Sequence, residues 1–165
     1  ITVREDEVIR PDGLPGIYGV VETRIAAGVL ALTPEMELCL VGQYRYPMNE
    51  YSWEIIEGGT EGAESPLDAI RRELREEAGL EAARWTQIAG GLHMTNCHSS
   101  ERACLFTATG LTDVGADPDG TEVLALRRVP FNDAVRMVMD GEIRDALSVM
   151  GILLLERRLR EGLLP

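Results

Sequence analysis

A chain of 165 residues, 45% of them hydrophobic, is expected to fold as one domain that buries about two-thirds of the surface its unfolded form would expose. Its formal net charge of −12 disfavours a role on nucleic acid, because binding to a phosphate backbone relies on a basic protein surface. The longest apolar run, residues 149–155, is too short to span a bilayer.

The first third of the chain predicts strands separated by turns. Residues 2–10 and 17–26 contain many β-branched residues and flank a Pro-Asp-Gly turn at 11–13, which predicts an N-terminal hairpin. A second strand pair is expected around the turn at residues 33–35. The strands that follow the hairpin are predicted at residues 28–32, 37–46 and 51–56.

The periodicity changes at Ser65, and a helix is predicted over Pro66–Ala78. Ser65 is a suitable N-cap, and Pro66 occupies a position whose missing N–H costs nothing. Asp68 adds an acid to the first turn, and Gly79 supplies a left-handed stop. One apolar stripe that would pack on a sheet is formed by Leu67, Ile70, Leu74 and Ala78.

The remainder of the chain also predicts strands and helices. The expected strands are residues 85–88, 103–109 and 122–129, and the expected helices are residues 132–140 and 145–160. No internal repeat, linker or low-complexity stretch interrupts the chain. We therefore predict a single α+β sandwich over residues 1–165.

The three cysteines, Cys39, Cys97 and Cys104, are an odd number and lack the C-x-x-C spacing of a zinc site. They indicate reduced, mostly packed thiols. The residues from Ile1 onward show no basic-then-apolar signal, so a cytoplasmic location is expected.

Three acids of the predicted helix lie within about a third of its circumference, beside the apolar stripe. These acids are Glu73, Glu76 and Glu77. Like charges at such spacing destabilise a helix by roughly 0.2–0.5 kcal/mol per pair, and a hard divalent cation such as Mg²⁺ or Mn²⁺ removes the penalty. The alternative is a solvated face on which arginines neutralise the acids. The arginines available for this are Arg71, Arg72 and Arg75.

The loop before the helix favours the metal interpretation. Gly58 is followed after five residues by Glu64, and seven residues later comes the run R-E-L-R-E-E-A-G-L at 72–80. At every fixed position this string resembles the signature of the Nudix family, G-x5-E-x7-R-E-U-x-E-E-x-G-U, in which U is a bulky aliphatic residue.

The resemblance implies a metal-dependent Nudix hydrolase with the Nudix fold, a mixed β-sheet between helices. Mg²⁺ is the expected cofactor, and Mn²⁺ is expected to substitute for it. The metal ligands implied by the resemblance are Glu73, Glu76, Glu77 and the backbone carbonyl of Gly58. Glu64 and Arg72 are expected to brace the loop and to orient the carboxylates during catalysis.

Hydrolysis of a pyrophosphate bond requires positive charge on the phosphate oxygens and an activated water. In this family the general base commonly lies outside the box, on a loop that differs among subfamilies. Glu101, just before a predicted strand, and Glu122, at the start of the next, are the candidates, and Glu64 is the next choice. Each of the two could instead be a solvated loop residue.

Residues outside the box resemble the ADP-ribose pyrophosphatase branch, which hydrolyses nucleoside diphosphate sugars. They are Q-Y-R-Y-P at 43–47, followed by Trp53 and Glu54. Arg45 could grip a phosphate with its guanidinium fork, and Trp53 could stack on a base, with Glu54 beside them in the substrate site. The alternatives are a strand-edge salt bridge for Arg45 and a packed core position for Trp53.

The loop after the box departs from that branch. ADP-ribose enzymes tend to have a Ser-Pro-Gly-like turn there, whereas this chain has M-T-N-C-H at 94–98. Dinucleoside polyphosphates and oxidised nucleotides therefore remain alternative substrates, and a non-catalytic nucleotide-sensing module is a third possibility that the intact acids disfavour. His93 and His98 lack metal-ligand spacing and are expected at the surface.

The same branch forms dimers through an N-terminal segment. By that likeness, residues 1–26 are expected to contribute to a homodimer interface, while residues 27–165 form the catalytic core. A two-stranded hairpin alone is marginal in water, so it must pack on a partner or on its own domain. The expected partners are a small-molecule nucleotide and a second copy of the chain, with no nucleic acid and no membrane.

Overall fold

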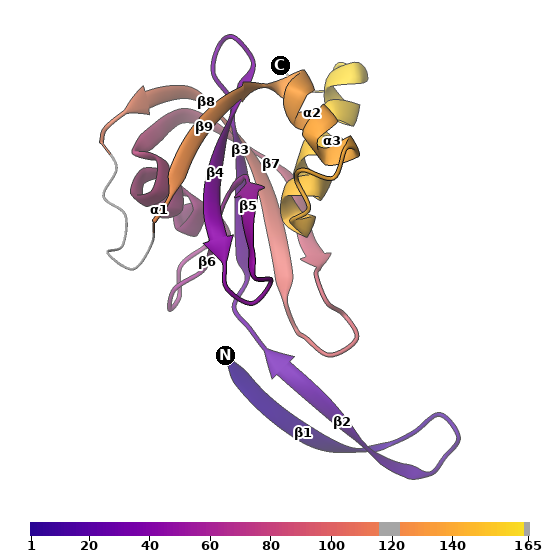
Figure 1. The fold of residues 1–165 in the computed structure, drawn as a ribbon. Helices are drawn as coiled ribbons and strands as arrows, with labels where there is room; N and C mark the ends of the chain where they lie inside the picture. Colours follow the sequence, from indigo (N-terminus) through magenta and orange to yellow (C-terminus); the bar gives the residue numbers. More distant parts are fainter. Residues whose placement is uncertain (116–122, 164–165) are drawn as a thin grey trace.

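The computed structural model describes residues 1–115 and 123–163 (Figure 1). Its first strands are β1 (Thr2–Ile9), β2 (Pro15–Glu22), β3 (Ala26–Ala31), β4 (Glu37–Arg45), β5 (Glu50–Glu54) and β6 (Ile56–Gly59). They are followed by α1 (Pro66–Ala78), β7 (Leu80–His93), β8 (Arg102–Asp113), β9 (Ala125–Pro130), α2 (Phe131–Met139) and α3 (Ala146–Arg160). The predicted α+β class is confirmed.

The strands after β2 form two sheets. One sheet has the order β6-β3-β8-β7, and because β3 runs parallel to β8 while the other pairs are antiparallel, it is mixed as predicted. The other has the order β5-β4-β9 and is antiparallel throughout. Helix α1 lies on one side of these sheets, and α2 and α3 lie on the other (Figure 1).

Two predicted strand arrangements are wrong. Residues 28–32 and 37–46 were expected to pair, but only one isolated bridge joins Leu32 to Leu38. The reason is that β6 and β8 occupy both edges of β3, so β4 joins the other sheet. The strand expected at residues 51–56 is interrupted at Ile55, where the chain passes from β5 in one sheet to β6 in the other.

Two hydrophobic clusters fill the spaces on either side of the strands. One packs α1 against the sheets through residues such as Ile70 and Leu74, as the predicted stripe requires. The other packs α2 and α3 through residues such as Met137 and Leu147. Each cluster includes alternate residues of β3 and β4, so these strands are buried on both faces.

Helix α1 begins and ends where the sequence predicts. The Ser65 side chain accepts a hydrogen bond from the Asp68 backbone N–H at 3.2 Å. Gly79 ends the helix in the left-handed region with φ of 63°, a conformation that a residue with a Cβ rarely adopts. These boundaries fix how the box acids face the neighbouring strands.

The predicted later helices are confirmed to within one residue at each end, with Asp145 acting as the N-cap of α3. The strands β7 and β8 are longer than predicted and pair along most of their length. The start of the strand expected at residues 122–129 lies outside the described residues, and β9 begins at Ala125. No helix in the described part of the chain combines the length and apolar character needed to cross a membrane.

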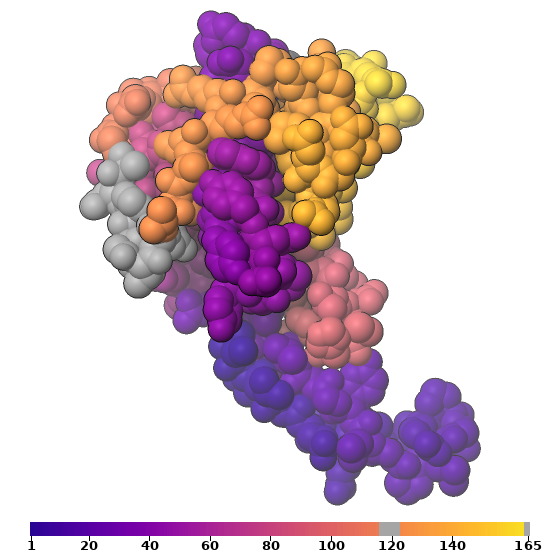
Figure 2. All heavy atoms as spheres, viewed as in Figure 1, coloured from indigo at the N-terminus to yellow at the C-terminus, as the bar shows by residue number. Residues whose placement is uncertain are grey.

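The predicted N-terminal hairpin is confirmed. Strands β1 and β2 pair from Thr2 with Glu22 to Ile9 with Pro15 and extend away from the rest of the molecule (Figures 1 and 2). The second strand stops at Glu22 rather than continuing to residue 26. There its backbone is held by the 98–100 loop, with Val21 N–H donating to the carbonyl oxygen of His98 at 2.7 Å.

Candidate functional site

The box begins where strand β6 meets helix α1. Gly58 pairs with Ala27 of β3 and lies directly against Glu73 of the helix. A Cβ added at Gly58 would lie 2.2 Å from the Glu73 carboxyl group, far inside van der Waals contact. Only glycine therefore allows this acid to approach the β6 backbone so closely.

Arg72 joins three of the box acids. Its Nη1 donates hydrogen bonds to Glu73 Oε1 at 2.8 Å and to Glu76 Oε2 at 3.0 Å. Its Nε and Nη2 donate to Glu64 at 3.4 and 3.3 Å, and Nη2 also donates to the carbonyl of Gly59 at 3.2 Å. The predicted brace between the loop and the carboxylates is therefore present in the geometry.

The ion pairs of Arg72 shift the protonation equilibria of the network. Burial alone would lower the pKa of Arg72, but its hydrogen bonds to Glu64, Glu73 and Glu76 outweigh that effect and raise the pKa. The hydrogen bond from Arg72 lowers the pKa of Glu64, with a second contribution from the Glu61 backbone N–H. The two pKa shifts keep Arg72 positively charged and Glu64 negatively charged near neutral pH.

The three acids of α1 differ in burial. Glu77 is only 7% exposed and lies on the core side of the helix, whereas the side chain of Glu76 is open to solvent. Glu73 lies between these extremes. The sequence placed all three beside the apolar stripe, and for Glu77 the structure places the side chain within the buried face itself.

The donor set at this corner suits a hard divalent cation, because it consists of carboxylate oxygens beside a backbone strand that Gly58 leaves free of a side chain. Within residues 1–115 and 123–163, no three His, Cys, Asp or Glu side chains are gathered tightly enough to hold a metal ion. The Arg72 guanidinium instead bridges Glu73 and Glu76. A bound cation would replace the Arg72 guanidinium as the positive group beside Glu73 and Glu76.

A second polar cluster, not predicted from the sequence, lies on the opposite side of β6. The Ser148 hydroxyl of α3 donates to Glu57 Oε1 at 3.0 Å and accepts from the Ile55 backbone N–H at 3.0 Å. Burial raises the pKa of Glu57 well above its ordinary value, and the neighbouring Asp145 carboxylate raises it further. Hydrogen bonds from Glu57 and from the Ser148 backbone N–H outweigh burial and lower the pKa of Asp145.

Two of the predicted substrate residues meet as an ion pair. The Nε of Arg45 donates to both carboxylate oxygens of Glu54, at 3.0 and 3.1 Å, and its Nη2 also contacts Glu54. Glu54 is 2% exposed, and its hydrogen bond raises the pKa of Arg45. The alternative of a strand-edge salt bridge thus describes the geometry of Arg45, which still leaves part of its guanidinium exposed.

This ion pair forms one wall of a cavity of about 460 Å³ beside the first turn of α3. The cavity is lined by Arg45, Pro47, Met48, Glu50, Ser52, Glu54, Arg144, Asp145 and Ala146. Arg144 lies on the α3 side of this lining and pairs with Glu50 at 3.0 Å. The cavity therefore offers arginine side chains from two separate segments, together with the buried carboxylate of Glu54 and the partly exposed carboxylates of Glu50 and Asp145.

Trp53 is partly buried against the α2 and α3 cluster, as the core alternative predicted. The Arg127 guanidinium lies 5.7 Å from its ring centroid, and the Tyr51 ring meets it edge-on with a centroid distance of 5.7 Å. These neighbours occupy positions that a stacking base would need, so stacking on Trp53 requires Arg127 to move.

Of the two candidates for the general base, the structure describes Glu101. Glu101 precedes β8, and the start of that strand is level with Gly59 across the sheet, because Ala26 pairs with both Gly59 and Ala103. Glu101 therefore lies near the end of the sheet at which β6 runs into the box loop. Glu122 lies outside the described residues.

The two histidines are exposed at the surface, as expected. The three cysteines are free, but they differ in exposure, since Cys39 is buried, Cys104 is partly buried and Cys97 is exposed. The prediction of packed thiols is therefore wrong for Cys97, which lies in the loop that contacts the hairpin and has the His98 ring nitrogen 3.1 Å from its sulfur.

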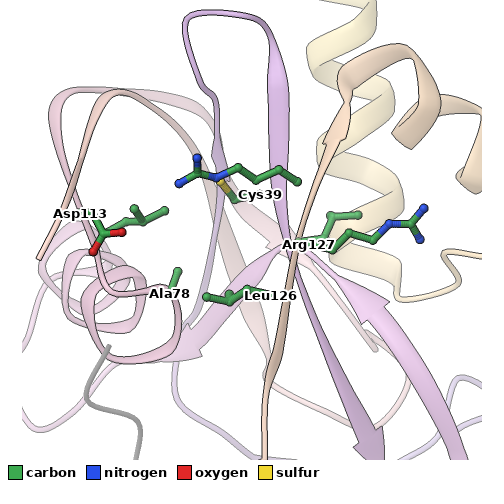
Figure 3. Close-up of a pocket in the computed structure, with 8 residues that line it drawn as sticks. Cys39, Ala78, Asp113, Leu126 and Arg127 are labelled. Carbon is green, nitrogen blue, oxygen red and sulfur yellow. The ribbon is translucent and has the colours of Figure 1, made fainter. Parts of the chain in front are cut away.

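Cys39 lines a separate hollow of about 260 Å³ near the end of α1, with Asp113 and Ala78 on one side and Leu126 on the other (Figure 3). Burial raises the pKa of the Cys39 thiol, and Arg128 partly offsets the effect. Among the described residues, no predicted ligand or substrate residue lines this hollow. We assign no role in the reaction to it.

Comparison with family models matches the chain along most of its length. A model described as the NUDIX domain matches residues 22–149. The chain belongs to the Nudix family. A second model, described as the nucleoside diphosphate sugar hydrolase N-terminal domain, matches residues 1–21, which include β1 and most of β2. The family predicted from the box is thereby confirmed, and Nudix hydrolases generally use divalent metal ions.

Several named proteins are similar to this Nudix hydrolase over nearly its whole length. An ADP-ribose pyrophosphatase of Mycobacterium tuberculosis is 32% identical over 154 residues, covering 92% of this chain and 74% of that protein. An ADP-ribose pyrophosphatase of Bacillus subtilis is 29% identical over 160 residues, covering 96% and 85%. A methanol dehydrogenase activator of Bacillus methanolicus is 27% identical over 154 residues, covering 92% and 83%.

A solved structure described as an ADP compounds hydrolase superimposes with a TM-score of 0.83 and covers 98% of this chain and 95% of its own. Its sequence identity is 22%, so the comparison bears on the fold. It supports the predicted fold over nearly the whole chain.

Proposed function

We propose that this Nudix hydrolase cleaves the pyrophosphate bond of a nucleoside diphosphate sugar, with ADP-ribose as the leading substrate and Mg²⁺ as the metal. The observation that carries the proposal is the approach of Gly58 to Glu73, beside Glu76 and Glu77 on the same helix. The N-terminal family match and the two relatives named ADP-ribose pyrophosphatase narrow the substrate class. The products would be a nucleoside monophosphate and a sugar phosphate.

The reaction needs its negative charges compensated. When bound, a divalent cation would neutralise phosphate oxygens and lower the pKa of the attacking water. Glu73, Glu76 and Glu77, with the Gly58 carbonyl, are the groups we assign to holding it. Arg72 would keep Glu64 and the loop in register with the helix through the hydrogen bonds described above.

Arg45 and Glu54 would contribute to substrate binding from the cavity beside α3. Because Glu54 holds both Nε and Nη2 of Arg45, the planar guanidinium is oriented in advance, while the Arg45 side chain as a whole stays partly exposed to a phosphate. Trp53 is the candidate platform for a base and would require displacement of Arg127. These assignments predict that Arg45→Met raises KM for the substrate more than it lowers kcat.

We assign the general base to Glu122 or Glu101, each outside the box. The location of Glu101 near the end of the sheet at which Gly59 also lies supports its candidacy. A general base typically contributes about 10²–10⁴-fold, so the relevant Glu→Gln change should lower the rate with little effect on metal affinity. If both single variants and the double variant retain the full rate, Glu64 becomes the candidate.

A substrate panel in the presence of Mg²⁺ tests the proposal. ADP-ribose and other nucleoside diphosphate sugars should yield nucleoside monophosphate and sugar phosphate, measured by chromatography. A preference for dinucleoside polyphosphates or oxidised nucleotides would move the assignment to another Nudix substrate class. Binding of nucleotides without turnover of any panel member would support the non-catalytic sensing module instead.

The homodimer belongs to the same proposal. The hairpin carries exposed apolar side chains at Ile1, Val3, Ile9, Leu14, Ile17 and Tyr18. Hydrogen bonds to its own domain include those from β2 to the loop at residues 97–100, and the hairpin projects away from the core (Figure 2). A partner copy would cover this apolar surface and could bring the hairpin near the second active site.

Light scattering of the full chain should give a dimer mass at micromolar concentration, and a monomer mass would contradict the proposal. Deletion of residues 1–21 should give monomers with weakened substrate binding. A cytoplasmic location stays a prediction from the sequence, and the absence of a nucleic-acid partner stays a prediction from the net charge.

A further inference from the structure

Strand β6 is short and lies at the edge of its sheet, so ladder hydrogen bonds hold it on one side only. It pairs with β3 from Gly59 to Ile56, and no described strand pairs with its other edge. Ile55, just before it, belongs to neither sheet. The segment that presents Gly58 to the box helix therefore needs support from outside the sheet.

Ser148 supplies that support from helix α3. Its hydroxyl is fully buried, accepts the Ile55 backbone N–H at 3.0 Å and donates to Glu57 Oε1 at 3.0 Å. These two hydrogen bonds hold the chain on either side of Ile56. One hydroxyl thus satisfies a buried N–H that the sheets leave unpaired and fixes the side chain adjacent to Gly58.

The first turn of α3 is itself held firmly in place. The Ser148 backbone N–H donates to the capping carboxylate of Asp145 at 2.7 Å. Small residues let the helix approach the strands closely, since a Cβ added at Gly151 would lie 3.1 Å from Leu30 and one at Gly28 would lie 3.0 Å from Leu147. Ser148 is therefore a fixed point against which β6 can be aligned.

We infer that Ser148 is a positioning residue for the metal site, setting the location of the Gly58 carbonyl relative to Glu73 through Ile55 and Glu57. The inference rests on the proposed metal role of Gly58 and the box acids. Ser148 belongs to α3, which packs on the opposite side of the strands from the box helix α1. Hydrogen-bonded supports of this kind typically account for about 10–100-fold in metal affinity.

The test compares Ser148→Ala with Thr107→Val, which removes another buried hydroxyl from a strand that does not pair with β6. Mn²⁺ affinity is measured by electron paramagnetic resonance on the full chain without substrate. Ser148→Ala should bind Mn²⁺ about tenfold more weakly or worse, with kcat reduced and KM within about twofold. Thr107→Val should bind Mn²⁺ as the parent chain does.

Hydrogen exchange of the metal-free chain separates positioning from general destabilisation. Peptides covering residues 55–59 should exchange faster in Ser148→Ala, while those of α1 keep their protection. Equal acceleration in both segments, or Mn²⁺ affinity within about twofold of the parent chain, would overturn the inference. If the parent chain binds no Mn²⁺, both the proposed metal function and the inference about Ser148 fail.

If Ser148→Ala does not fold, a second pair of variants at Glu57 tests the same support of β6. Glu57→Gln keeps an acceptor for the Ser148 hydroxyl, whereas Glu57→Ala removes it. We expect Mn²⁺ affinity near that of the parent chain for Glu57→Gln and about tenfold weaker for Glu57→Ala. Equal affinities in the two variants would overturn the role of this support.

Discussion

The two sides of strand β6 handle buried charge in different ways. On the α1 side, Glu73 and Glu76 both accept hydrogen bonds from the shared Arg72 guanidinium. On the α3 side, the pKa of Glu57 is raised by burial and by Asp145, and a serine hydroxyl completes the hydrogen bonding. The first arrangement gathers carboxylate oxygens that could bind a cation, whereas in the second a raised pKa and a serine hydrogen bond accompany a rigid support. In the proposed account, neighbouring residues of one strand serve different purposes, with Gly58 at the metal site and Glu57 in its support.

The largest expected effect lies on the α1 side. Glu77→Gln removes one carboxylate charge from the metal site with almost no change in volume, so turnover should fall by at least about a hundredfold. The fold should be retained, as checked by circular dichroism and thermal melting. Undiminished turnover in a folded variant would remove Glu77 from the metal site.

A smaller effect is expected from adding one methyl group on the same side. In Gly58→Ala the new Cβ would lie 2.2 Å from Glu73, so the acid or the strand must move. Overpacking costs about 1–3 kcal/mol, and we expect turnover to fall about tenfold or more. Gly59→Ala is the matched control, because no atom lies within 4 Å of its added Cβ. Equal rates in the two variants would show that the contact with Glu73 has no function.

The smallest effect on turnover is expected at Ser65, which lies at the start of α1 as Ser148 lies at the start of α3. Ser65 caps α1 in an exposed position, and Ser65→Ala should lower the free energy of unfolding by about 1 kcal/mol. Turnover at saturating metal should stay within about twofold, because Ser65 contacts Asp68 and no box acid. A large fall in Mn²⁺ affinity in this variant would mean that any weakened helix start disturbs the site, and that Ser148 is not special.

The sequence predicted the α1 side well because its information is local. The cap at Ser65, the stop at Gly79 and the spacing of the acids all lie within one continuous segment, and helical geometry alone relates them. The family resemblance implied one metal site for Gly58 and Glu73, and the structure places the two residues in direct contact. The deeper burial of Glu77 depends on the packing of the whole helix and was not predicted.

The α3 side could not be predicted because its residues are far apart in the chain. Ser148 and Ile55 are brought together by the packing of α3 on the sheets, and no spacing rule connects them. The placement of β3 and β4 in different sheets was missed for a related reason. The turn after Ala31 suggested a hairpin between these strands, but β3 pairs with β6 on one edge and with β8 on the other. Alternation along β6 was a usable signal, because it places Glu57 and Gly58 on opposite faces.

The most direct test of the account measures AMP release from ADP-ribose at a series of free Mg²⁺ concentrations in the full chain. We predict no product above background in excess EDTA, recovery when excess Mg²⁺ is added back, and a rate that saturates with metal. Release of AMP at the full rate in excess EDTA would contradict the central claim that the acids of α1 act through a bound divalent cation.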